Sequence, residues 1–188
     1  AVVASMLVVF ARMSRPHSAV LGRIGNTTTY RNVERFPEAH TIDGVRVIRI
    51  DAALSFVNAT NVKRLLLDHA AKLEAEPRAL VLDASGINDV DATGAEMLDE
   101  VIDELRDNGV SLHLADVKGP VRDVLRRSGA WDHTHIDVHA STFDAIDAIN
   151  RGGRLDVRDH RGVGIDENVV VAAPAPSADA DRELPTHV

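Results

Sequence analysis

The sequence predicts an α/β domain built on a mostly parallel sheet of four to five strands. Between residues 45 and 150, short apolar segments alternate with longer amphipathic ones. The amphipathic segments, of at least 10 residues, are long enough to be helical crossovers between neighbouring parallel strands. Hydrophobic residues make up 45% of the chain but aromatic residues only 3%, so the core of this domain must be aliphatic.

Four segments have the composition of strands. Residues 45–50 (VRVIRI) are rich in β-branched residues and follow an Asp-Gly turn. The apolar run 79–84 (ALVLDA) is typical of a strand that is buried on both faces. Residues 111–115 (SLHLA) and 133–138 (HTHIDV) complete the set.

Four helices are expected between and after these strands. Apolar side chains recur at helical spacing over residues 58–75, 92–107, 119–128 and 141–150. The polar and glycine residues that would begin or end these helices are Asn58, Ser141, Asn108, Gly109 and Gly129.

The flanking segments differ in character. Residues 1–13 are apolar and then turn basic, and they are too short for a membrane span of about 20 residues. Because the arginines follow the apolar run, we expect the cytoplasmic end of a truncated transmembrane helix, with an N-terminal helix of a soluble protein as the alternative. Residues 14–41 are expected to form a linker leading into a domain at 42–150. The Ala/Pro/Asp-rich residues 151–188 are expected to form a disordered tail.

Charge and cysteine content exclude several classes of function. The net charge is −8, and residues 41–150 carry 11 basic and 20 acidic side chains. Since contacts to phosphates dominate the affinity for nucleic acids, this acidic and aromatic-poor region predicts no nucleic-acid partner. The absence of cysteine excludes disulfides, thiolate metal sites and a cysteine nucleophile.

The loop between the predicted strand 79–84 and the helix 92–107 is the candidate functional site. Asp91 is placed to cap the helix, and Thr93 falls in its first turn, where the helix dipole favours an anion such as phosphate. No base stands nearby in the sequence to activate a hydroxyl, which favours recognition or a phospho-switch over catalysis. A loop that only caps the helix is the open alternative. The candidate residues are Asp83, Ser85, Gly86, Asp89, Asp91, Thr93 and Gly94.

Two further interpretations would give the chain chemistry of its own. Residues 89–93 (DVDAT) match the Asp-x-Asp-x-Thr pattern of aspartate-based phosphatases, but that pattern needs an apolar strand directly before its first aspartate, and Gly-Ile-Asn stands there. His133, His135 and His139 would share one face of a strand and could bind zinc or copper. The pattern forces no carboxylate or other fourth ligand alongside them, so solvated histidines on an edge strand are the favoured interpretation. We therefore expect no enzyme, no metal and no cofactor.

An acidic stripe runs along the predicted helix 92–107, opposite its apolar face. Its carboxylates are spaced three or four residues apart, where like charges repel by a few tenths of a kcal/mol per pair. Both a solvated face and a docking face for a basic protein partner are consistent with this stripe. Its residues are Glu96, Asp99, Glu100, Asp103, Glu104 and Asp107.

The candidate loop and its flanks resemble a known family. Residues 83–98 (DASGINDVDATGAEML) are similar to the signature of the STAS domain, which sulfate permeases share with anti-sigma-factor antagonists. Residues 15–39 and 44–66, with DAALSFVNA (51–59) entering the first helix, resemble the junction between the last membrane helix and the STAS domain of sulfate-permease-type anion transporters.

This resemblance implies a fold, a place and a partner. It implies helices mainly on one face of the sheet. It also implies a non-catalytic regulatory domain on the cytoplasmic side of the inner or plasma membrane, with the membrane domain of the same transporter as its partner. Binding of a nucleotide, proposed for some STAS domains, is left open.

One position separates the two branches of the family. Anti-sigma-factor antagonists are phosphorylated in an Asp-Ser-[Ser/Thr]-Gly box, usually on the residue directly after the aspartate. Here the box is Asp91-Ala92-Thr93-Gly94, with alanine at the usual acceptor position. This favours the transporter branch, and a free-standing signalling protein like an anti-sigma-factor antagonist is the alternative.

Overall fold

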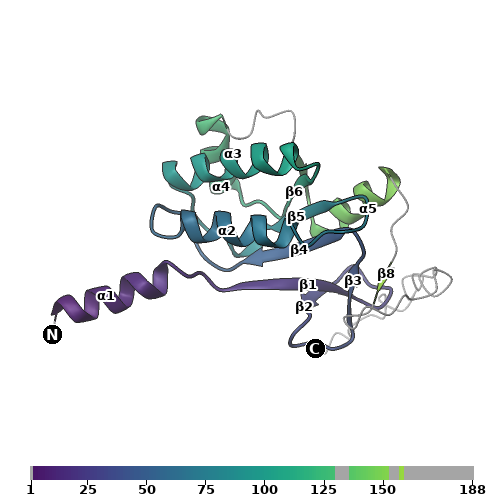
Figure 1. Cartoon of the computed structure of the whole chain (residues 1–188), viewed down its shortest axis with the longest axis horizontal. Helices are drawn as coiled ribbons and strands as arrows, with labels where there is room; N and C mark the ends of the chain where they lie inside the picture. Colours follow the sequence, from purple (N-terminus) through teal and green to yellow (C-terminus); the bar gives the residue numbers. More distant parts are fainter. Residues whose placement is uncertain (1, 130–135, 153–156, 159–188) are drawn as a thin grey trace, which may run out of the picture.

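The computed structural model describes residues 2–129, 136–152 and 157–158. They form one mixed sheet of eight strands. Three helices cover one face of this sheet and a further helix packs on the other face (Figure 1). The N-terminal helix projects away from this body (Figure 1). The α/β class and the placement of the helices mainly on one face are confirmed.

The parallel half of the sheet follows the sequence prediction. β4 (Val45–Ile50), β5 (Ala79–Asp83), β6 (Ser111–Ala115) and β7 (Ile136–His139) lie side by side in this order, and each pair is parallel. The bounds of β4 and β6 agree with the prediction to the residue. The first three residues of the strand predicted at 133–138 lie outside the described residues.

The antiparallel half corrects the sequence prediction. β1 (Ser18–Ile24) pairs antiparallel with β2 (Tyr30–Asn32), β3 (Ala39–Ile42) and β4. β3 also pairs antiparallel with β4 and with β8 (Val157–Arg158). The sheet is therefore mixed, and the prediction of a mostly parallel sheet of four to five strands is wrong. The predicted linker 14–41 supplies three of the extra strands, which are too short or too interrupted to show a clear alternating pattern.

Five helices belong to the described part of the chain. Ser141 begins the last of them as predicted, because its Oγ accepts a hydrogen bond from the backbone N–H of Asp144 at 3.1 Å. Asn58 stands at the N-cap position of α2 as predicted, but its side chain makes no capping hydrogen bond to the first turn. The helices are α1 (Val2–Met13), α2 (Ala59–Ala70), α3 (Ala92–Asp107), α4 (Gly119–Ser128) and α5 (Thr142–Gly152).

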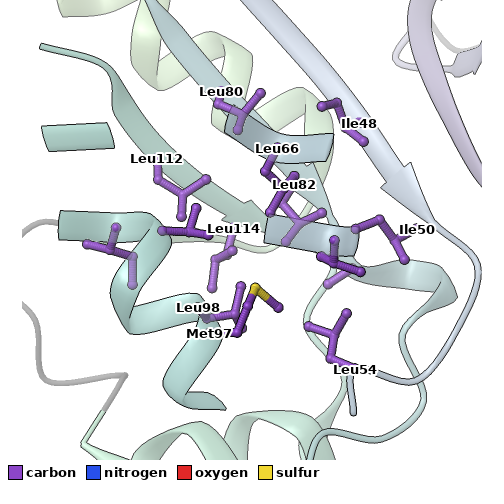
Figure 2. Packing of buried hydrophobic residues seen from close by; sticks show 14 of the residues in the cluster. Ile48, Ile50, Leu54, Leu66, Leu80, Leu82, Met97, Leu98, Leu112 and Leu114 are labelled. Atoms are coloured by element: carbon purple, nitrogen blue, oxygen red, sulfur yellow. The ribbon is translucent and has the colours of Figure 1, made fainter. Parts of the chain in front are cut away.

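The core has two parts, one on each face of the sheet. Between the sheet and α2, α3 and α4, leucine and isoleucine side chains interdigitate, including Leu66, Leu82 and Leu98 (Figure 2). On the other face, Ala145 and Ile146 of α5 pack with the small and β-branched residues of the strands. No aromatic side chain is among the buried hydrophobic residues of the described segments, in agreement with the prediction of an aliphatic core.

α1 is the apolar segment predicted at residues 1–13. It has 12 residues and exposes Val2, Val3, Met6 and Val8. Within the described residues, no helix combines the length and the apolar character that a membrane span needs. The expected tail at 151–188 lies outside the described residues except for residues 151–152 and 157–158.

Candidate functional site

The candidate loop lies at the edge of the sheet where the parallel strands end. Asp83 closes β5, is buried, and accepts a hydrogen bond from the backbone N–H of Ser85 at 2.9 Å. Asp116, just after β6, accepts one from the backbone N–H of Thr142 at 3.1 Å. Burial raises the pKa of Asp116, and the nearby charge of Asp83 adds to this increase. Two acidic side chains thus stand close together at this edge, both tied to backbone donors.

Asp91 joins two loops with one side chain. Its Oδ1 accepts a hydrogen bond from the backbone N–H of Gly94 at 2.8 Å, which confirms the predicted cap of α3. Its Oδ2 accepts another from the backbone N–H of Phe56 at 3.0 Å, a contact that the sequence did not predict. The loop before α2 and the loop before α3 are therefore held at a fixed distance.

A short backbone bridge reinforces this connection. Leu54 donates its N–H to the carbonyl of Asp89 at 3.0 Å and accepts from the N–H of Asp91 at 3.0 Å. Leu54 and Val90 form an isolated parallel bridge, and both side chains are buried. The two loops behave as a small extension of the sheet.

Two glycines permit the close approach of these loops. A Cβ at Gly94 would lie 2.5 Å from the carbonyl oxygen of Leu54, and one at Gly86 would collide with the carbonyl oxygen of Ile50. Neither glycine is among those with positive φ in the described chain. Their role is therefore to leave space for the neighbouring backbone.

Asn58 fixes the first of the two loops from within. It is buried, and its Oδ1 accepts from the N–H of Ser55 at 3.0 Å while its Nδ2 donates to the carbonyl of Ala53 at 2.8 Å. The neighbouring Phe56 is 69% exposed, although its backbone N–H is bound to Asp91. Phe56 was not predicted to be a site residue. Its position in the DAALSFVNA segment, directly before the first helix of the domain, is the feature that could have indicated it.

The hydroxyl groups of the loop have no activating partner. Ser85 and Thr93 are exposed, and within the described residues neither hydroxyl hydrogen-bonds to a carboxylate or an imidazole. Asp89 is exposed and accepts a hydrogen bond from the adjacent N–H of Val90 at 2.9 Å. β5 ends at Asp83, well before Asp89, so the strand–aspartate geometry of the phosphatase pattern is not present here.

The acidic stripe of α3 is partly neutralised by cations. Lys63 of α2 places its Nζ 3.0 Å from Glu100 and 3.3 Å from Glu104. Arg106 forms ion pairs with the two further stripe residues Asp103 and Asp107. The stripe residue Glu96 is exposed and Asp99 is half-buried. Lys63 was not predicted as a partner because its position relative to α3 depends on the tertiary packing.

The histidines form a pair and no metal centre in the part of the chain described. His113 Nδ1 lies 3.1 Å from His139 Nε2, and Ser111 Oγ lies 3.1 Å from the other ring nitrogen of His113. His133 and His135 lie outside the described residues. Within the described segments, no three metal-ligating side chains of this kind lie together.

Comparison with known families identifies this arrangement. The model of the family described as "STAS domain" matches residues 36–145. The chain belongs to the STAS domain family. The matched range includes the β4–α2 loop, the Asp91 loop and α3, so the site described above lies wholly inside the STAS domain.

Relatives of this STAS domain with curated descriptions are sulfate transporters. Sulfate transporter 1.3 of Arabidopsis thaliana is 32% identical over 149 residues, which cover 74% of this chain and 23% of that protein. High affinity sulfate transporter 2 of Stylosanthes hamata is 33% identical over 129 residues, with 64% and 19% covered. The chain thus spans less than a quarter of the length of these two relatives.

Solved structures agree on the fold. The murine Slc26a9 anion transporter in its inward-facing state superposes with a TM-score of 0.68 at 22% identity, over 80% of this chain and 25% of that one. A Thermotoga maritima protein assigned to the anti-sigma factor antagonists superposes with a TM-score of 0.51 at 16% identity, over 60% and 93%. Both branches of the family therefore share the fold of this STAS domain.

Proposed function

We propose that this STAS domain is the non-catalytic regulatory domain of a sulfate-type anion transporter and lies on the cytoplasmic side of the membrane. The sulfate transporter relatives support the proposal, since this chain corresponds to a part of each of them. Transport would belong to the rest of such a protein. The role left for the STAS domain is to contact the membrane domain and bias its activity.

The observation that carries this proposal is the pair of hydrogen bonds made by the Asp91 carboxylate. Both of its carboxylate oxygens accept backbone hydrogen bonds, from Gly94 and Phe56. Both oxygens of this carboxylate are therefore engaged in holding the backbone of the two loops. Its effect is to hold the backbone of Phe56, whose ring is exposed, beside the first turn of α3, where Ala92 and Thr93 are exposed. A rigid surface with a large aromatic side chain is typical of a site that binds another protein.

The acidic stripe of α3 extends the same surface. Attraction to a basic partner would speed the encounter between the two domains and would weaken as salt is added. Four of the stripe carboxylates already have a basic neighbour in Lys63 or Arg106. Glu96 lies on the first turns of α3, next to the Asp91 loop, and is exposed. The docking surface that we propose therefore consists of Phe56, the Asp91 loop and the first half of α3.

α1 connects this surface to the membrane in the same proposal. Its exposed valines and methionines lie on a helix that projects away from the body of the domain (Figure 1). We assign α1 to the cytoplasmic end of a membrane helix, followed by Arg15 at the membrane surface. The docking surface would then lie on the body of the domain, tethered to the membrane domain by this helix.

The test is sulfate uptake by the complete transporter in proteoliposomes. Phe56→Ser removes the exposed ring of the proposed surface, while Phe36→Ser removes an exposed ring that is not part of it. We expect Phe56→Ser to change the uptake rate by roughly fivefold or more, in line with a coupling of about 1 kcal/mol. Phe36→Ser should leave the rate unchanged. Equal rates for both variants at equal protein amounts would contradict the regulatory surface.

The signalling alternative makes a different prediction. An antagonist-like switch requires phosphate on Thr93 or Ser85, and both hydroxyls are exposed. Incubation with cell extract and ATP followed by mass spectrometry would detect it. Phosphate at Thr93 would favour the signalling protein, and its absence would favour the transporter domain. Equilibrium dialysis against ATP and GTP tests the nucleotide as a partner in the same preparation.

A further inference from the structure

A pocket of about 310 Å³ opens between the segment after α1 and helix α2. It shares no residue with the Asp91 loop. Ile50 and Val62, both buried, contribute an apolar floor. Three permanently charged cations line it, Arg15, Arg64 and Lys72, together with one carboxylate. The pocket is therefore locally basic in a chain whose net charge is −8.

Asn61 holds the two walls of this pocket together. Its Nδ2 donates a hydrogen bond to the carbonyl of Ser14 at 2.7 Å, which ties the segment after α1 to α2. Its Oδ1 accepts a hydrogen bond from the Arg64 guanidinium at 2.6 Å. One amide thus closes the end of the pocket and orients one of its cations, so that part of the site is organised before a ligand arrives.

Two further basic groups stand at and behind the wall of the pocket. His69 lines it, and burial lowers the pKa of its imidazole, with the charges of Arg46 and Lys72 adding to the effect. The nearby Asp68 carboxylate opposes this decrease. Arg46 of β4 is half-buried, and its Nε has no hydrogen-bond partner within the described residues. The positive charges of Arg46 and Lys72 therefore lie close to His69, where they would attract an anion.

We infer that this pocket binds a phosphate group, through Arg15, Arg64 and Lys72. Guanidinium and ammonium groups are the side chains that proteins use for such oxyanions. The volume is sufficient for a lipid headgroup or for a free phosphate ion. The pocket lies where α1 joins the body of the domain, two residues beyond Met13, and the projecting α1 exposes apolar side chains (Figure 1). This inference goes beyond the proposed docking surface and does not depend on it.

The experiment compares a variant that lacks two cations of the pocket with a control variant that lacks two cations of α4. Arg64→Gln with Lys72→Gln neutralises the pocket, and Arg126→Gln with Arg127→Gln removes the same charge from the exposed last turn of α4. Circular dichroism establishes that both 188-residue variants are folded. Binding is measured by co-sedimentation with vesicles of phosphatidylcholine, with or without phosphatidic acid. Inorganic phosphate is titrated separately while amide and imidazole resonances are followed by NMR.

The expected result is selective loss in the pocket variant. Its binding to phosphatidic acid vesicles should weaken by roughly tenfold or more relative to the unmodified chain, while the α4 variant keeps most of its binding. Phosphate-induced shifts at His69 and Asn61 that vanish in the pocket variant would identify free phosphate as a ligand. Selective vesicle binding without such shifts would identify the lipid. The inference would be overturned if vesicle binding fell equally in both variants, or in neither, and if phosphate moved no resonance of the pocket residues.

Discussion

The backbone N–H of Phe56 donates a hydrogen bond at 3.0 Å to the carboxylate of Asp91, which lies 35 residues later in the chain. The other carboxylate oxygen caps α3 through Gly94. Loops that precede helices are usually among the more mobile parts of a domain. Here one side chain ties the backbone of Phe56 to the start of α3, so the two loops are held together while the Phe56 ring is exposed.

Removal of the Asp91 side chain should therefore destabilise the domain. We expect Asp91→Ala to lower the free energy of unfolding by about 1–2 kcal/mol, because the cap and the bond to Phe56 are both lost. Asp91→Asn should cost less, since its amide oxygen still accepts from Gly94. Urea unfolding measures both variants. As the control, Asp89→Ala should stay within about 0.5 kcal/mol, because Asp89 is exposed. An equal cost for Asp89→Ala would refute this role of Asp91.

The space left by Gly94 gives a second prediction. A Cβ at this position would lie 2.5 Å from the carbonyl oxygen of Leu54, which belongs to backbone that is held by the bridge to Val90. Gly94→Ala should cost about 1–3 kcal/mol through the forced separation of the loops. At Gly119, the first residue of α4, a Cβ would meet nothing within 4 Å. Gly119→Ala should be neutral or slightly stabilising in the same urea experiment. A comparable loss at Gly119 would show that the contact with Leu54 is not the cause, because alanine favours the helix more than glycine does and meets nothing at that position.

The parts of the fold that the sequence predicts well are those whose signals are local. β4, α3, β6 and α4 begin and end where the sequence indicates, because a turn, a cap or a terminating glycine stands at their ends. The capping by Asp91 and Ser141 belongs to the same class. In each case the deciding residues lie within a few positions of the element that they bound.

The antiparallel half was missed because its signals are not local. β2 has three residues and β3 has four, too few to show an alternating pattern. β1 contains Gly22, and a glycine inside a strand weakens the strand signal in the sequence. Only the folded chain shows why glycine stands there, because an added Cβ would lie 2.9 Å from the carbonyl oxygen of His40. Its pairing with β4 joins Ser18 to Ile50, a contact that only the folded chain provides.

The candidate site shows the same division. The acidic loop and the start of the helix could be predicted, because their residues are contiguous in the sequence. The roles of Phe56, Asn58 and Lys63 could not be predicted, because they arise from contacts between separate loops and helices. The Asn58 side chain illustrates the limit, since its position before α2 suggests a cap while its hydrogen bonds stabilise the preceding loop.

The buried His113 predicts a pH dependence of stability. Burial lowers the pKa of its imidazole, His139 adds to this decrease, and Asp137 opposes it. The folded state then binds fewer protons than the unfolded state, so this contribution to stability is present above the unfolded pKa of about 6.5 and is lost as the pH falls. His113→Gln should reduce the dependence of unfolding free energy on pH below about 6.5, by at most about 1.4 kcal/mol per pH unit. An NMR titration midpoint for His113 at or above about 6.5 would exclude this explanation.

Tyr30 gives a prediction that can be measured by absorbance, because it is the only tyrosine in the chain. Burial raises its pKa to about 12, against an opposing effect of Arg23. At pH 11, only about a tenth of the tyrosine should be ionised while the domain is folded. The ultraviolet absorbance of tyrosinate follows this titration, and denaturant provides the unfolded reference. A midpoint near 10 in the folded protein would show that the ring is solvated.

The position of Lys63 between Glu100 and Glu104 leads to the last prediction. Its ammonium group lies 3.0 Å and 3.3 Å from the two carboxylates, and the hydrogen bond to Glu100 is the main cause that raises its pKa. The three side chains are partly exposed, so each ion pair contributes about 0.2–1 kcal/mol at most. In Lys63→Gln, Glu100 and Glu104 lose their cation and repel each other at i,i+4. We expect unfolding free energy to fall by about 0.5–1 kcal/mol at low salt, and this loss to shrink in 1 M NaCl, where the screening length is about 3 Å. Arg127→Gln, which removes an exposed charge from α4, is the control and should show neither effect.

The same variant separates the two interpretations of the acidic stripe. If the stripe docks a basic partner, Lys63→Gln leaves two more carboxylates uncompensated on α3, and association with the membrane domain should strengthen at low salt although the isolated domain is less stable. The triple variant Asp99→Asn, Asp103→Asn, Asp107→Asn should have the opposite effect, because it removes negative charge from the same face. Opposite changes in affinity cannot both follow from a loss of stability, so they would identify direct electrostatic attraction. Association in the complete transporter that is unchanged in both variants at low salt, with intact circular dichroism spectra, would leave the stripe as a solvated face.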